Sequence, residues 1–377
     1  MTTPADPGSR SSPGMTPIPP VSRTTEVAPV LDQHRFDEAS LTSYMRQHIE
    51  GFTAPLTVGQ VRGGMSNPTF VLTDGAGMRY VLRKKPPGTL LPSAHAVDRE
   101  FRVISALWPT KVPVAQPYVL CQDTSVIGTD FYLMDFVDGR VFHQLALPEM
   151  TAEQRRDIYG AMIEVMAALH QVDFRAVGLG DFGRIGGYME RQLRRWTQQY
   201  AASQTEDIPE MHRLMAWLPA HMPAESATTI VHGDFRLENM IFHPTEPRVL
   251  AVVDWELSTL GAPLSELAYN CLPYYVPDER RGDLLNLDYA SYGIPSETDY
   301  VARYCQYTGR RAIPAWTFYV VFSLFRLAAI VQGVYKRGLD GNASSPEAIT
   351  FGDQCRQLAT AAWVLVEQEE SALESRG

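Results

Sequence analysis

Two short polar motifs, each attached to an apolar run, constrain the fold of this chain more than any other feature of its sequence. The first is VHGDFRLEN at residues 231–239, and the second is VVDWE at residues 252–256. The apolar runs at 229–231, 240–242 and 249–253 predict short strands, which places both motifs at tight turns. Asn239 can then return toward Asp234 from the end of its loop, and Asp254 stands at the tip of the last strand.

Phosphoryl transfer requires this combination of side chains. A carboxylate must lie beside the attacking hydroxyl to orient it and accept its proton, and hard oxygen ligands must hold Mg²⁺ against the nucleotide phosphates. Asp234 fits the first role, and Asn239 and Asp254 fit the second. Two other interpretations are an ordinary polar turn with Asp254 as a strand-end cap, and a hydrolase in which the two aspartates form an acid–base pair. The hydrolase interpretation leaves the position of Asn239 unexplained.

The rest of the sequence predicts two lobes. Between residues 31 and 136, strand-like runs at 56–61, 69–72, 79–83, 118–121 and 131–136 accompany helical patterns at 36–49 and 94–107. From 137 to 377 the chain is mostly helical, with helices expected near 151–172, 187–200, 209–220, 263–270, 298–307, 315–336 and 346–373. A β-rich front and an α-rich back indicate a cleft between them. Residues 1–30 are rich in Pro, Ser, Thr and Gly, so a disordered tail is expected there.

Composition narrows the possible partners. The 33 basic and 43 acidic residues give a formal charge of −10, which argues against nucleic acid because its phosphates call for a basic face. The four cysteines make no CxxC pair and no apolar signal segment opens the chain, which favours a reduced, cytoplasmic protein. Residues 316–335 approach the length of a membrane span, but polar residues interrupt them, so we expect a buried helix and no membrane partner.

The pattern HGDxxxxN, followed by a strand that ends in DWE, resembles the aminoglycoside phosphotransferase and choline kinase family, whose members are relatives of the protein kinases. The resemblance implies an α+β, protein-kinase-like two-lobed fold. Its N-lobe would be a small antiparallel β-sheet with one main helix, and its C-lobe larger and mostly helical. It also implies a kinase that uses ATP and Mg²⁺, with Asp234 as catalytic base, His232 supporting the loop, and Asn239 and Asp254 as metal ligands. A related fold that binds nucleotide without catalysis is the nearest alternative.

The N-terminal lobe agrees with this family in order and spacing. A loop that would cover the phosphates contains Gly63, Gly64, Ser66 and Asn67. The basic cluster at 81–85 resembles the strand that bears the phosphate-binding cation. Strand alternation puts Arg83 and Lys84 on opposite faces, and Arg83 is favoured as the cation that faces the phosphates. Glu100 resembles the ion-pair partner of that cation, although an ordinary helix-surface pairing is an alternative. The segment Met134, Asp135 and Phe136 resembles the hinge whose backbone meets adenine.

One position departs from the family pattern. After DWE the family commonly reads G-D-P…D-L-A, whereas residues 261–268 read GAPLSELA. Glu266 therefore stands where an aspartate usually braces the catalytic loop, and its extra methylene leaves that contact in question.

The acceptor site of this fold is built by the helical lobe. The candidate lining residues are Arg236, Glu256, Tyr269, Tyr274, Arg326 and Lys336. Arg326 lies in the most apolar helix, where an unpaired cation would be costly. It either binds an acidic group of the substrate or pairs with a structural carboxylate, and the second interpretation is favoured.

Longer runs, including residues 80–88, 91–100 and 325–342, are similar to kinase-like domains joined to, or encoded beside, acyl-CoA dehydrogenases. This branch implies an acceptor hydroxyl on a hydroxyacyl group or hydroxy acid, or on its CoA thioester, and a functional link to an acyl-CoA dehydrogenase. Phosphorylation would turn a poor leaving group into a good one. The alternatives are an aminoglycoside or choline/homoserine-type kinase, for which a strongly acidic acceptor cleft is expected, and a catalytically silent nucleotide-binding regulator.

Overall fold

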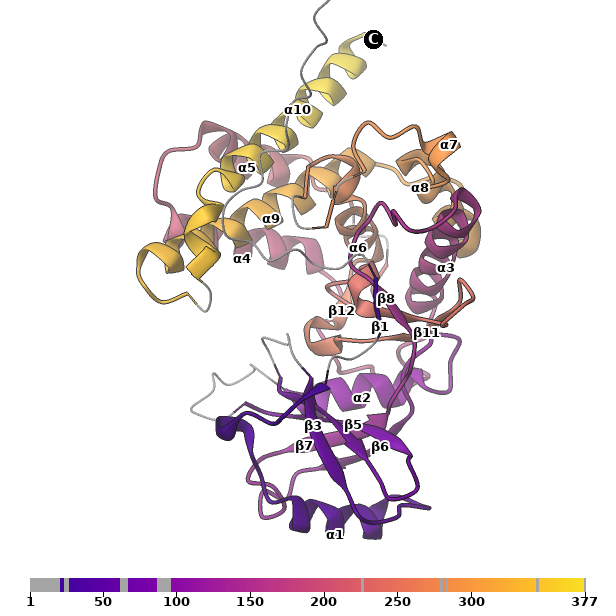
Figure 1. Cartoon of the computed structure of the whole chain (residues 1–377). Coiled ribbons are helices and arrows are strands. Elements are labelled where there is room, and N and C mark those ends of the chain that lie inside the picture. The colour runs from indigo at the N-terminus through magenta and orange to yellow at the C-terminus, as the bar shows by residue number, and fades with distance from the viewer. Residues whose placement is uncertain are drawn as a thin grey trace, which may run out of the picture.

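A six-stranded antiparallel sheet forms the first lobe of the computed structural model (Figure 1). The structure describes residues 21–23, 27–61, 67–86, 96–224, 227–278, 281–282, 284–343 and 346–375. The strands are β2 (Val27–Ala28), β3 (Thr57–Val61), β4 (Thr69–Thr73), β5 (Arg79–Lys84), β6 (Pro117–Cys121) and β7 (Phe131–Asp135), in the order β2-β3-β4-β5-β7-β6. The antiparallel sheet expected from the sequence is therefore present, with β2 added at one edge.

Two helices cover opposite faces of this sheet because its side chains alternate. Helix α1 (Glu38–His48) buries Leu41 and Met45 in one small core, which also contains Leu82 of β5. Helix α2 (Val97–Leu107) lies on the other face, between the sheet and the second lobe (Figure 1). Strand β5 turns Arg83 toward α2, and the next residue, Lys84, faces the α1 side.

The chain enters the second lobe through a short mixed region of strands and turns. Strand β8 (Arg140–Phe142) pairs with β10 (Met240–Phe242), which pairs with β11 (Val249–Val252), and β9 (Thr229–Val231) pairs with β12 (Thr259–Gly261). A side chain at Gly139 would lie 2.2 Å from the Phe242 carbonyl oxygen, so only glycine fits where the lobes join.

Helices make up most of the second lobe (Figure 1). They are α3 (Ala152–His170), α4 (Tyr188–Ser203), α5 (Pro209–Ala220), α6 (Pro263–Asn270), α7 (Tyr289–Tyr292), α8 (Glu297–Thr308), α9 (Trp316–Leu339) and α10 (Gln354–Glu374). Thr151 starts α3 in a reciprocal pair with Gln154, in which each side chain accepts from the other's backbone N–H. Helix α9 is long and apolar enough to cross a membrane, but 72% of its most apolar window is buried among the other helices, as the sequence led us to expect.

The expectation of a disordered tail over residues 1–30 is wrong for five of those residues. Strand β1 (Val21–Arg23) pairs with β8, and β2 pairs with β3. Both segments gain their backbone partners from strands far along the chain, a source of order that local composition does not reveal. Residues 1–20 and 24–26 lie outside the described residues.

Candidate active site

The loop between β9 and β10 brings a carboxylate and an amide together. Asn239 donates from Nδ2 to the Asp234 main-chain oxygen at 2.8 Å and to Asp234 Oδ2 at 3.0 Å. Both hydrogen bonds use the amide nitrogen, so Asn239 Oδ1 remains available as an oxygen ligand. Asp234 Oδ2 also lies 3.1 Å from Nη2 of Arg236, and the Asp234 side chain is 17% exposed.

His232 fixes the path of this loop. Its Nε2–H donates to the Val253 carbonyl oxygen at 2.9 Å, while Nδ1 accepts from the backbone N–H of Asp234 at 3.2 Å. The ring is fully buried and lies 4.7 Å from the ring of Trp255, centroid to centroid. His232 therefore joins the two sequence motifs from inside and does not face the cleft.

Glu266 of α6 braces the same loop from behind. Its carboxylate accepts from the backbone N–H of Gly233 at 2.6 Å and of His232 at 3.1 Å, and from His170 Nε2 at 2.9 Å. Nδ1 of His170 in turn meets the Tyr304 hydroxyl at 2.8 Å. Burial acts to raise the pKa of Glu266, but His170, His232 and the Gly233 amide outweigh it, so the pKa is lowered. The bracing contact is therefore made with glutamate in place of the usual aspartate.

Asp254 stands at the end of β11 with a left-handed backbone, at φ 68° and ψ 55°. This conformation is costly for a residue other than glycine and occurs mostly at functional sites. The Asp254 side chain is 36% exposed, and Oδ1 lies 3.4 Å from Nη2 of Arg83. An exposed carboxylate beside the free Oδ1 of Asn239 supplies the hard oxygen donors that Mg²⁺ prefers, so the residues present fit the metal.

Arg83 connects the two lobes. Its Nε lies 3.2 Å from Glu100 Oε2, and the Tyr132 hydroxyl donates to the same oxygen at 3.0 Å. Glu100 is 1% exposed, so the pairing is not the ordinary surface pairing that remained an alternative. Burial acts to lower the pKa of Arg83, but the neighbouring Tyr132, Glu100 and Asp254 raise it. Arg83 therefore keeps its positive charge.

The other predicted residues of the sheet lobe fall into three groups. Lys84 points away from this site, with Nζ 5.8 Å from the centroid of the Phe70 ring. Asn67 donates from its amide to Glu100. Gly63, Gly64 and Ser66 lie outside the described residues, so the phosphate-covering loop stays a prediction.

The hinge segment ends β7 and begins the crossing between lobes. The backbone N–H of Asp135 donates to the Gln116 carbonyl at 2.8 Å, and Met134 pairs with Val81 of β5. Phe136 donates to the Arg79 carbonyl at 3.4 Å. The contact of this segment with adenine stays a prediction.

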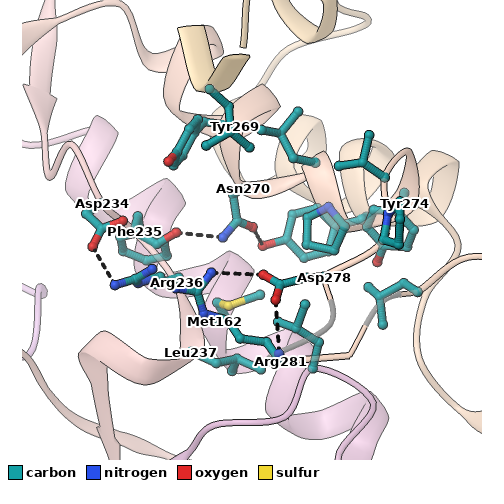
Figure 2. Close-up of a pocket in the computed structure, with 18 of the residues that line it drawn as sticks. Met162, Asp234, Phe235, Arg236, Leu237, Tyr269, Asn270, Tyr274, Asp278 and Arg281 are labelled. Atoms are coloured by element: carbon teal, nitrogen blue, oxygen red, sulfur yellow. Dashed lines mark hydrogen bonds and ion pairs between the residues drawn. The ribbon is translucent and has the colours of Figure 1, made fainter. Parts of the chain in front are cut away.

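A pocket of about 130 Å³ opens beside Asp234 (Figure 2). Most of its wall is apolar or aromatic, from Leu145, Tyr159, Met162, Phe235, Leu272, Tyr274, Val276, Leu284, Tyr300, Leu327 and Leu358. Asn270 crosses it, donating to the Phe235 carbonyl at 2.8 Å and accepting from the Tyr300 hydroxyl at 2.5 Å. Of the predicted acceptor residues, Arg236, Tyr269 and Tyr274 line this pocket.

Two arginines and two carboxylates form an ion-pair network at this pocket. Arg281 lies 2.5 Å from Glu238 Oε2 and 3.0 Å from Asp278 Oδ2, and Arg236 lies 3.5 Å from Glu238. Burial acts to raise the pKa of Glu238, but His143 and the two arginines lower it to about 2. No pattern in the sequence indicates Arg281, because its loop carries no helical or strand period. His170 was visible only as the last residue of an apolar helix face.

Three predicted acceptor residues lie elsewhere. Glu256 is close enough to Arg83 and Glu100 to act on their charges, which puts it on the sheet-lobe side. Lys336 pairs with Asp340 at 2.5 Å, about 15 Å along α9 from Arg326. The favoured interpretation of Arg326 is wrong, since within the described part of the chain it has no carboxylate partner. It contacts the Gly233 carbonyl at 3.4 Å and the Tyr269 ring at 4.7 Å, because α9 passes directly behind the catalytic loop.

Comparison with known proteins agrees with this geometry. The model of the phosphotransferase enzyme family, abbreviated APH, matches residues 57–310. A Ralstonia eutropha protein assigned by name to the aminoglycoside phosphotransferases is 50% identical, with a TM-score of 0.82 over 89% of this chain and 99% of that one. A crystal structure of spectinomycin phosphotransferase with ADP and spectinomycin has a TM-score of 0.57 at 11% identity over 87% of this chain and 98% of that one, which shows the shared fold.

Two curated relatives carry the name of another enzyme class. Human acyl-CoA dehydrogenase family member 11 is 45% identical over 90% of this chain and 44% of its own length. Mouse acyl-CoA dehydrogenase family member 10 is 48% identical over 84% of this chain and 30% of its own length. The chain thus spans less than half the length of these relatives. Since the family model covers most of the chain and the fold is that of a kinase-like phosphotransferase, the chain belongs to the phosphotransferase enzyme family.

Proposed function

We propose that this chain transfers the γ-phosphoryl group of ATP to a hydroxyl group of a small molecule. One observation carries the proposal: Asp234, Asn239 and Asp254 converge opposite the cation Arg83, although Arg83 is far from all three in the sequence. An ordinary polar turn would not bring a buried Arg83–Glu100 pair from another lobe to the tip of β11.

Each residue has a role that follows from its contacts. Asp234 orients the acceptor hydroxyl and accepts its proton, since Arg236 and Asn239 hold Oδ2 while Oδ1 is left for the pocket. Asn239 and Asp254 would hold Mg²⁺, which when bound supplies positive charge beside the phosphoryl oxygens. Arg83 is held by Glu100 so that its guanidinium binds phosphate oxygens. Glu266 and His232 keep the loop in place.

The pocket beside Asp234 supports a hydroxyacyl or hydroxy acid acceptor, free or as its CoA thioester. Its wall is mostly apolar, and its two carboxylates, Asp234 and Asp278, each have an arginine partner. An acceptor with many amines, such as an aminoglycoside, would favour unpaired carboxylates there. An apolar chain that carries one hydroxyl suits the wall better.

The curated relatives support two further parts of the proposal. Their names pair this kind of chain with acyl-CoA dehydrogenases, so we infer that the phosphorylated product passes to chemistry on acyl groups. The four cysteines are free and buried, which suits the cytoplasmic location that we propose.

The nucleotide site is tested first by calorimetry. Mg·ATP should bind the wild-type protein and bind Asp254→Ala markedly more weakly, because the variant loses an anionic metal ligand. Asp234→Asn should bind Mg·ATP nearly as well as the wild type but lose turnover. If turnover survives in Asp234→Asn, the assignment of the base is wrong.

The acceptor is tested by ADP release with hydroxy acids of increasing chain length, their CoA thioesters, an aminoglycoside and choline. We expect turnover with a hydroxyacyl compound and none with the aminoglycoside or choline. Turnover with an amine-rich acceptor would contradict the argument from the apolar wall. Nucleotide binding with no turnover on any acceptor would favour the silent nucleotide-binding regulator.

A further inference from the structure

Three arginines gather behind the catalytic loop in a chain whose formal charge is −10. Arg191 and Arg195 come from α4, and Arg326 comes from α9; together they are called the arginine cluster below. Helix α4 lies at the edge of the helical lobe that is turned toward the sheet lobe (Figure 1). Across the described ranges, none of the three forms an ion pair with a carboxylate.

Aromatic rings lie beside two of the three arginines. The guanidinium groups of Arg195 and Arg326 lie 5.1 Å and 5.7 Å from the centroid of the Trp196 ring. Arg326 also lies 4.7 Å from the Tyr269 ring, and Tyr269 lines the pocket that contains Asp234. Arg191 donates to the carbonyl oxygens of Gly186 and Arg184. The charges of all three arginines act on Tyr188, so the cluster surrounds that side chain, and Arg326 reaches the catalytic loop at the Gly233 carbonyl.

This arrangement is unfavourable for the protein alone. Arg191 and Arg195 are spaced i, i+4, and like charges at that spacing repel on a helix. Arg191 also lies in the first turn of α4, where the helix dipole disfavours cations. Arg326 Nε is buried and has no hydrogen-bond partner. Two carboxylates lie nearby: Glu190, which is exposed, and Glu266, which His170 and the loop amides already occupy.

We propose that the arginine cluster binds a phosphate or pyrophosphate group carried by the acceptor, at a distance from the hydroxyl that reacts. Guanidinium forks match phosphate oxygens in shape and in charge. We assign the nucleotide to the other side of the catalytic loop, where Arg83 and Asp254 lie. The cluster belongs wholly to the helical lobe, which builds the acceptor pocket. This inference rests on the proposed function, because it assumes an acceptor.

The test is calorimetry on the full chain saturated with Mg·ADP, which keeps the probe out of the nucleotide site. The probes are coenzyme A, which carries pyrophosphate and phosphate groups, and inorganic pyrophosphate. Coenzyme A should bind the wild type, and Arg195→Gln and Arg326→Gln should each weaken binding about tenfold. The matched control is Arg46→Gln, an exposed arginine of α1 with no ion pair in the described structure; it should bind like the wild type.

Each outcome decides the proposal. The proposal of a phosphate-bearing acceptor is supported if coenzyme A binds more weakly at higher salt and if both Arg195→Gln and Arg326→Gln weaken its binding. Pyrophosphate binding without coenzyme A binding assigns the cluster to a free anion and overturns the proposal. It is also overturned if the variants bind coenzyme A like the wild type, or if the wild type does not bind it. A folding defect in Arg326→Gln would appear as lost Mg·ADP binding. In that case Arg195→Gln decides the outcome, because Arg195 is exposed. Coenzyme A binding involves neither Asp234 nor Asp254, so its loss is distinct from failure of the kinase proposal, which would appear as absent Mg·ADP binding by the wild type.

Discussion

Replacing Glu266 by glutamine isolates the role of one buried carboxylate in holding the catalytic loop. The two side chains have nearly the same shape, but glutamine offers one oxygen where glutamate offers two. In the structure Oε1 accepts from the Gly233 N–H, and Oε2 accepts from the His232 N–H and from His170. In either orientation of the amide, its NH₂ group faces a backbone N–H of the loop, and that donor is left without an acceptor.

The expected cost follows from this count. A buried backbone donor without a partner costs about 1–3 kcal/mol. The bonds that survive lose their charge assistance, which makes them roughly half as strong. We therefore expect Glu266→Gln to lower the free energy of unfolding by about 2–4 kcal/mol at pH 7. Turnover should fall by at least about tenfold, because small displacements of a catalytic loop are costly in rate. Affinity for Mg·ATP should change little, since Asp254 and Arg83 do not contact Glu266.

Urea unfolding, ADP release and calorimetry measure these three quantities. Glu266→Asp keeps the charge but shortens the side chain, so an intermediate loss is expected. Glu246→Gln is the matched control, because this exposed glutamate side chain forms ion pairs only with Arg248 and, more distantly, His243, and should change stability by less than about 0.5 kcal/mol. If Glu266→Gln unfolds and turns over like the wild type, the carboxylate does not brace the loop.

Two further predictions concern backbone strain and charge. Gly233 has φ +89°, and a Cβ there would lie 2.7 Å from the Leu257 carbonyl oxygen, so Gly233→Ala should destabilise by about 3 kcal/mol or more. Gly77 has φ +86° with open space around it, so Gly77→Ala should cost only about 1 kcal/mol in urea unfolding; equal costs would contradict the steric argument. Glu238 has its pKa lowered from 4.5 to about 2, so the stabilisation it gives is present above pH 4.5 and is lost as the pH falls toward 2. After allowance for partial exposure, Glu238→Gln should cost about 2 kcal/mol at pH 7 and less at pH 3 by the same measurement, and a constant difference would contradict this assignment.

The sequence alone was enough for much of the fold. Short strand-like runs predicted the strands β3 to β7, and apolar residues at helical spacing predicted most of the helices, because burial leaves a local pattern in the sequence. Two motifs predicted Asp234, Asn239 and Asp254, since loop chemistry depends on residues that are close along the chain. Strand alternation also separated Arg83 from Lys84, and the structure puts Arg83 at the site.

Other features were decided only by the tertiary structure. The order of residues 21–23 and 27–28 comes from pairing with strands elsewhere in the chain. Whether Glu266 reaches the loop depends on a distance between α6 and β9, which no spacing in the sequence encodes.

The surroundings of the acceptor site also come from packing. Arg326 has aromatic rings and a carbonyl as neighbours because α4, α6 and α9 converge behind the catalytic loop. The apolar wall of the pocket likewise joins residues from α3, α6, α9 and α10. Local sequence patterns report which face of an element is buried, whereas the partners of that face are fixed only when distant elements pack together.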